Sequence, residues 1–156
     1  MTSKQDFTDE EWVRIRRAPL VAGVAISLAD PGGPIEVAKE SVATLRSATL
    51  PPSQEELLAA VALDVQALAQ QRQNPLGDFK PRGGQQVLEE LREVNEIVTA
   101  KATPEEVEAF RGWLVAAARA AADAGKEGGF MGFGAERVSA GERQMLEQVR
   151  TAVGMA

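Results

Sequence analysis

The fold of this chain is decided by its longest apolar run, Ala18-Pro19-Leu20-Val21-Ala22-Gly23-Val24-Ala25-Ile26-Ser27-Leu28-Ala29. From Leu20 onward the run is apolar almost all round a helix, a pattern typical of a helix buried on most of its faces. The run is twelve residues long and is closed by Arg17 and Asp30, whereas a membrane-spanning helix needs about 20 apolar residues. It therefore predicts a central helix of a soluble protein, not a transmembrane segment.

A helix start precedes this run. Thr8 and Glu11 have the spacing of a capping box, and Phe7 can pack on Trp12 across it. Pro19 has no amide hydrogen, so we expect the helix to break or kink just before it.

The same kinds of signal predict helices along the rest of the chain. Three further capping boxes follow, at Ser53/Glu56, Thr103/Glu106 and Ser139/Glu142. The predicted helices cover residues 35–47, 53–72, 85–101, 103–122 and 139–153, with a long loop at 73–84 and stops at Gly125 and Gly154. The sequence has no alternating β-branched run bounded by hairpin turns. We therefore predict an all-α protein, a compact bundle of five to six helices that forms a single domain over residues 1–156.

Composition removes most of the usual catalytic groups. The 156 residues contain no histidine, cysteine or tyrosine. A disulfide framework, a thiolate metal site, a cysteine nucleophile and a serine–histidine pair are therefore excluded. Catalysis would have to use a carboxylate or a lysine with a shifted pKa. The sequence thus favours a protein that is not an enzyme, with carboxylate catalysis as the alternative.

The charge balance argues against a nucleic-acid partner. The formal net charge is −6, and phosphate binding needs a basic surface. The one basic cluster, Arg14, Arg16 and Arg17, is interpreted as a solvated helix face. The chain opens on polar residues rather than on a secretion signal, so we expect a cytoplasmic protein.

The glycine-rich stretch at 125–134 is the first candidate site. Five glycines in ten positions make the backbone costly to order, while the apolar side chains between them would be poorly placed in water. These side chains either close one end of the core or form a recognition loop for a partner or an apolar ligand. The residues of this predicted binding loop are Gly128, Gly129, Phe130, Met131, Gly132, Phe133 and Gly134.

Carboxylates give the second candidate site. Asp30 and Asp123 each end an apolar helix, and Glu127 and Glu142 lie in or just after the turn that follows the second of them. Oxygen ligands suit a divalent cation such as calcium, magnesium or manganese. The alternative interpretation is that these acidic residues only favour turns and helix starts, in which case no cofactor is expected.

An alanine-rich stretch predicts a close contact between helices in the C-terminal half of the chain. Ala116–Ala118 and Ala120–Ala122 leave little side-chain bulk on their helix. A neighbouring helix can therefore approach closely, either within the bundle or across a homodimer seam.

The C-terminal third also carries a family resemblance. Ala121-Ala122-Asp123 is followed by Val138-Ser139-x-x-Glu142 and then by Leu146, Val149 and Gly154. This helix–acidic turn–helix pattern resembles that of tellurite-resistance B-like proteins over about the last forty residues. The resemblance implies an all-α domain whose acidic residues bind metal in a stress response. The stretch Lys126–Gly134 resembles one found in small bacterial helical proteins, which implies no activity.

The sequence therefore favours a helical binding or interaction module that acts through the loop at 125–134, with a protein partner or a second copy of the chain as the ligand. An acidic domain that binds a divalent metal is the alternative.

Overall fold

The described part of the chain, residues 2–29, 34–126 and 140–155 of a computed structural model, contains six α-helices and no strand. The helices are α1 (Asp9–Ala29), α2 (Pro34–Thr49), α3 (Glu56–Gln70), α4 (Gly84–Lys101), α5 (Pro104–Lys126) and α6 (Ala140–Ala152), preceded by a short 3₁₀ helix, η1 (Lys4–Asp6). The predicted all-α bundle of five to six helices is confirmed.

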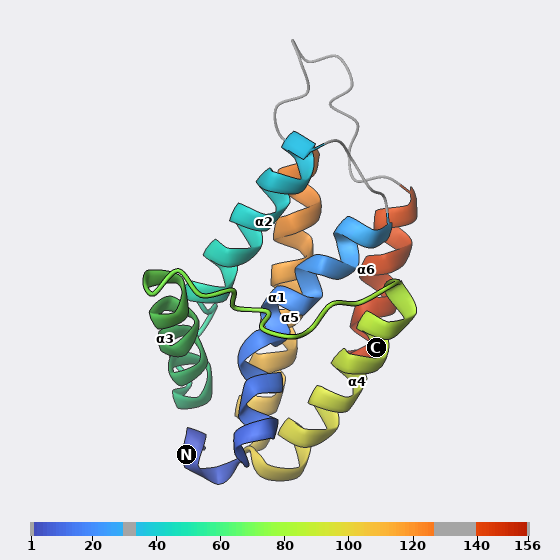
Figure 1. The fold of residues 1–156 in the computed structure, drawn as a ribbon. Helices are drawn as coiled ribbons and strands as arrows, with labels where there is room; N and C mark the ends of the chain where they lie inside the picture. The colour runs from blue at the N-terminus through green and yellow to red at the C-terminus, as the bar shows by residue number, and fades with distance from the viewer. Residues whose placement is uncertain (1, 30–33, 127–139, 156) are drawn as a thin grey trace.

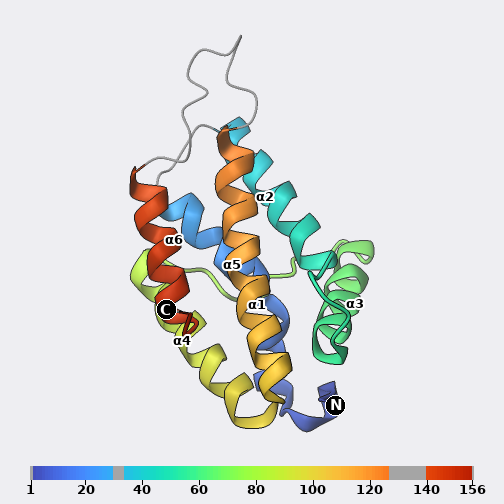
Figure 2. The same cartoon turned by 180° about the vertical axis from the view of Figure 1, so that it is seen from behind.

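Helices α1 and α5 form the centre of the bundle. Each of them contacts all five other helices, and the two views in Figures 1 and 2 show the others arranged around this pair. Both helices are buried because they are apolar on several faces: Val21 and Ile26 of α1 and Ala117 and Ala121 of α5 have no exposed surface. The alanine-rich face of α5 thus packs within the bundle.

Helix α1 continues through Pro19. The predicted break is absent, although the helix axis bends around the middle of its length (Figure 1). Pro19 removes one backbone hydrogen bond, but Ile15 and Val21 on either side of it are fully buried. We infer that packing of both halves in the core keeps the helix continuous.

Two of the predicted helix starts are confirmed. At α1, the Thr8 amide donates to the Glu11 carboxylate (2.8 Å) and the Glu11 amide donates to the Thr8 hydroxyl (3.1 Å). Thr103 and Glu106 make the same reciprocal pair at α5, both at 3.2 Å. The box predicted at Ser53 is wrong: α3 begins at Glu56, and the Ser53 hydroxyl is buried without a hydrogen bond to any described group.

The helix ends differ more from the prediction. Gly125 does not stop α5, which continues to Lys126. Gly154 does end α6: it takes a positive φ of 82°, and the next amide, of Met155, donates to the Arg150 carbonyl at 2.8 Å. Such a left-handed glycine is a common helix stop. Ser139, the predicted cap of the last helix, lies outside the described residues.

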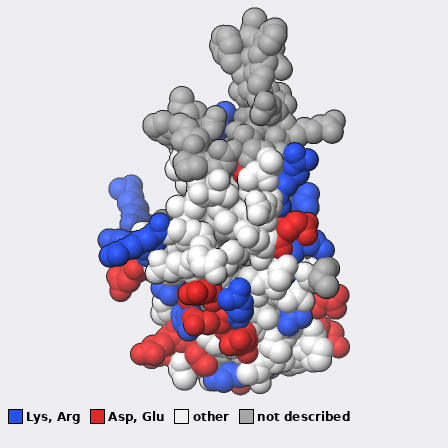
Figure 3. Space-filling model, turned by 90° about the vertical axis from the view of Figure 1, so that its right-hand side faces the viewer, with Lys and Arg blue, Asp and Glu red and all other residues white. Residues whose placement is uncertain are grey.

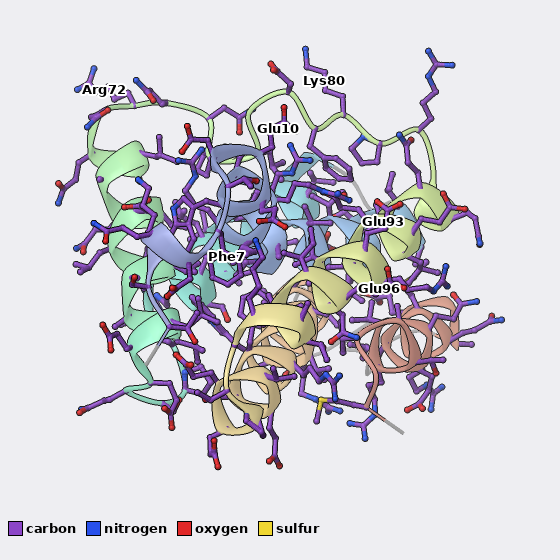
Figure 4. All side chains as sticks on the ribbon, turned by 90° about the horizontal axis from the view of Figure 1, so that it is seen from below. Phe7, Glu10, Arg72, Lys80, Glu93 and Glu96 are labelled. Atoms are coloured by element: carbon purple, nitrogen blue, oxygen red, sulfur yellow. The ribbon has the colours of Figure 1, made fainter. Side chains whose placement is uncertain are left out.

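A long connection, residues 71–83, joins α3 to α4 on the opposite side of α1. It crosses α1 (Figure 1), and in the view of Figure 4 its Arg72 and Lys80 side chains point away from the bundle. Leu76 and Phe79 pack against the core. The predicted loop at 73–84 is therefore present, and its apolar side chains fasten it across the bundle.

Candidate ligand pocket between α1 and α2

The site residues predicted from sequence are only partly described. Gly128 to Gly134, Asp30 and Glu127 lie outside the described residues. Asp123 is exposed near the end of α5, and Glu142 is buried in the first turn of α6. Within residues 2–29, 34–126 and 140–155, no three acidic side chains gather as a group that could hold a metal ion.

A partly enclosed hollow lies between α1, α2 and the 71–83 connection. Its volume is about 260 Å³. The apolar wall comes from three elements and consists of Leu20, Val24, Leu45, Pro75 and Leu76; the polar lining groups are Ser27, Ser41, Thr44 and Asn74. No charged side chain is among these lining residues.

A close helix crossing closes one side of this pocket. Gly23 of α1 also lines the pocket, and it faces Thr44 of α2 so closely that an added Cβ would lie 2.8 Å from the Thr44 Cβ and still nearer to its hydroxyl. Only a glycine leaves room for the two helices to meet at this distance.

Two of the polar groups that line the pocket, Ser27 and Thr44, bond to Glu40, which is 3% exposed. The Ser27 hydroxyl donates to the Glu40 carboxylate at 2.5 Å, and the Thr44 hydroxyl donates to the Glu40 carbonyl at 2.7 Å. Ser41, at the exposed side, donates to the Val37 carbonyl at 2.9 Å. Each lining hydroxyl therefore already donates its proton within the protein.

The connection that completes the pocket wall is held by an ionic cluster on α1 and α4. Arg17 donates to the buried Glu90 carboxylate at 2.8 Å, and its guanidinium carbon lies 4.9 Å from the centre of the Phe79 ring. Arg14 donates to Glu90 at 2.5 Å and also to Glu93. Arg17 thereby holds the Phe79 side chain in place. Phe79 lies three residues after Leu76, which forms part of the pocket wall.

The same cluster includes Arg14 and Arg17, two of the three arginines predicted to form a solvated helix face. Burial alone would raise the pKa of the Glu90 carboxyl, but hydrogen bonds from Arg14 and Arg17 outweigh burial and lower that pKa. Both arginines are thus committed to an internal partner. On the face seen in Figure 3, basic side chains of the lower half also lie among acidic ones.

Two other hollows are larger but more open to solvent. One, of about 520 Å³, lies beside Thr99, Arg111 and Met155. The other, of about 580 Å³, lies between α2 and α3 beside Val42, Thr49 and Gln66. Small-molecule sites bury most of the ligand surface, so the more enclosed α1–α2 pocket is the better candidate.

None of the sites predicted from the sequence includes this pocket. Its signal is the pair Gly23 and Ser27, two small residues four positions apart on one face of the apolar run. Such spacing places a gap and a hydroxyl side by side on a helix. The opposite wall of the pocket, formed by Thr44 and the 71–83 connection, depends on tertiary packing. No local sequence pattern predicts it.

Comparison of the chain with protein-family models, with curated proteins and with solved structures gave no match. The resemblance to tellurite-resistance B-like proteins therefore stays a prediction. None of the helices in the described ranges is long and apolar enough to cross a membrane.

Proposed function

We propose that this protein is a helical binding module that takes up a small apolar molecule in the pocket between α1 and α2. The observation that carries the proposal is the pocket itself, about 260 Å³ of partly enclosed space walled by three separate elements. A dry apolar cavity of about 150 Å³ is enough to bind benzene. The pocket therefore has room for a somewhat larger ring system.

The lining favours an uncharged ligand. Leu20, Val24, Leu45 and Leu76 offer apolar contact, which supplies binding free energy in proportion to the area removed from water. A few hydroxyl groups among such side chains are the usual means of orienting a ligand in an apolar site.

The predictions made from sequence alone stand beside this proposal untested. They are a partner-binding loop at Gly128–Gly134, a divalent-metal site, a protein partner or homodimer, and a cytoplasmic location. The pocket is preferred because ten described residues from α1, α2 and the 71–83 connection line it.

The proposal is tested by titrating the ¹⁵N-labelled protein with indene, an apolar bicyclic hydrocarbon, and following the amide resonances of Gly23 and Leu45. We expect saturable shifts at these positions. Val24→Phe places an aromatic ring in the pocket and should abolish them. Val13→Phe is the matched control, because Val13 lies on the same helix, is 37% exposed and does not line the pocket.

Either of two results would overturn the proposal. One is an absence of any shift up to the solubility limit of indene. The other is equal binding by the Val24→Phe variant and the Val13→Phe control.

A further inference from the structure

We infer that the ligand of the α1–α2 pocket carries a hydrogen-bond donor, an O–H or N–H group, on its apolar body. This inference rests on the proposed function and adds the chemical class of the ligand. It follows from which groups accept the hydrogen bonds that the lining hydroxyl groups donate.

A hydroxyl group has one proton and two lone pairs. The protons of Ser27, Ser41 and Thr44 are donated to the Glu40 carboxylate, the Val37 carbonyl and the Glu40 carbonyl, respectively. What these three groups can still offer to the pocket is lone pairs. A ligand that donates a proton can use them, and a ligand that only accepts cannot.

Turning a hydroxyl proton toward the ligand would be costly at Ser27. Its bond to Glu40 is made to a carboxylate, and charge-assisted hydrogen bonds are roughly twice as strong as neutral ones. The Glu40 side chain is also almost fully buried, so loss of a donor to it would leave part of a buried carboxylate less well satisfied.

The other polar lining group lies at the outer side of the pocket. Among the described lining residues, Asn74 alone has side-chain N–H groups, and it is exposed to solvent. The inner part of the pocket thus presents acceptors.

Three bicyclic probes of nearly the same shape separate these possibilities: indole, which has an N–H donor; indene, which has no polar atom; and benzofuran, which has an acceptor oxygen. Dissociation constants are measured by titration of the intact labelled protein. A net hydrogen bond of the usual strength makes indole bind about threefold to tenfold more tightly than indene. Benzofuran should bind no better than indene.

Two variants assign the acceptor. Thr44→Val keeps the shape of the side chain and removes its hydroxyl, and Ser41→Ala removes a hydroxyl at the exposed side. We expect at least one of them to bring the ratio of indole affinity to indene affinity, measured within that variant, close to one. Ser27→Ala is the third variant of the series. Because Ser27 also bonds to Glu40, the affinity of this variant for indene shows whether the pocket is still formed.

The outcomes distinguish this inference from the proposed function. If none of the three probes binds, the proposed function fails and this inference with it. If all three bind equally, or benzofuran binds best, the pocket is a binding site but the donor inference is wrong. An indole preference that persists unchanged in all three hydroxyl variants would also overturn it.

Discussion

At the scale of single residues, Glu106 joins three parts of the chain. Its carboxylate is 2% exposed and accepts hydrogen bonds from the Thr2 hydroxyl (2.5 Å), from the Thr2 and Leu57 amides (both 3.3 Å) and from the Thr103 amide (3.2 Å). Burial alone would raise the pKa of this carboxyl, but the hydrogen bonds from Thr2 and Thr103 outweigh burial and lower it. The ionised form is therefore the one that stabilises the fold.

Glu106→Gln should lower the free energy of unfolding at pH 7 by about 1–3 kcal/mol, because an amide cannot accept all of these bonds and leaves buried donors unpaired. Since the pKa of Glu106 is lowered in the folded state, its contribution is complete above the ordinary glutamate pKa. It is lost as the pH falls through the lowered value. Urea unfolding at pH 7 and at steps down the acid range measures both effects.

The neighbouring Glu105 provides the control for this prediction, since it is exposed and Glu105→Gln should change stability little. A Glu106→Gln variant as stable as the control at pH 7, or a deficit that grows in acid, would contradict the role assigned to the carboxylate.

Sequence reasoning could find only the local half of this residue's contacts. The Thr103–Glu106 pair lies within one turn, so spacing alone predicts it. Thr2 and Leu57 lie 104 and 49 positions away, and no spacing rule reaches them. The same limit explains Glu90, whose partners Arg14 and Arg17 are 76 and 73 positions distant.

At the scale of helices, two glycines lie inside helices, where glycine is intrinsically unfavourable, but in opposite packing environments. Gly23 of α1 has Thr44 of α2 directly against it, whereas an added Cβ at Gly112 of α5 would meet nothing within 4 Å. Alanine is favoured over glycine inside a helix by about 1 kcal/mol. Packing therefore decides the sign of the effect at each position.

We expect Gly112→Ala to stabilise the protein by about 0.5–1 kcal/mol. Gly23→Ala should destabilise it by about 1–3 kcal/mol, because the new methyl group forces α1 and α2 apart. Thermal and urea unfolding of the two variants, compared with the parent chain, measure both changes. Stabilisation by Gly23→Ala would mean that the two helices do not cross as closely as described.

Helix interiors were predictable and helix ends were less so. The stripe of Val87, Leu91, Val94 and Val98 on α4 is buried as its periodicity predicts. The intrinsic preferences of Pro19 and Gly125 predict helix interruptions, yet α1 and α5 run through them. At Pro19 the surrounding core contacts outweigh the local preference, and sequence spacing does not report such contacts.

At the scale of the whole molecule, every helix in the described residues packs against the central pair, α1 and α5. Every other helix contacts both α1 and α5. The two tryptophans report on different regions of this core: Trp12 donates to Asp64 of α3, and Trp113 donates to the Ser47 carbonyl of α2, each at 2.7 Å. Loss of either central helix would remove contacts from all the others.

We therefore expect a single cooperative unfolding transition. In the single-tryptophan variants Trp12→Phe and Trp113→Phe, the denaturant midpoint from the remaining tryptophan's fluorescence should equal the midpoint from far-ultraviolet circular dichroism of the same variant. A fluorescence transition that clearly precedes the loss of helix in either variant would show that one region unfolds separately.

The fold class was available from the sequence at this scale, because capping boxes, apolar stripes and breakers are repeated along the whole chain. The pocket was not. It arises where Gly23, Thr44 and Leu76 meet, and these residues belong to segments whose relative placement only the packed bundle defines.

The 71–83 connection also divides the chain into two near-equal halves that cannot be self-sufficient. The first half holds α1 and the second holds α5, so each half keeps one central helix and lacks the other. Arg72 in this connection is exposed and points outward (Figure 4), where trypsin can reach it and cut the chain before Gln73. Cleavage there would yield two fragments. Each would expose the apolar surface of its central helix, which packs against the central helix of the other fragment in the intact protein. The protein is thus built in a way that suits fragment complementation, with reassembly of the two pieces restoring the common core.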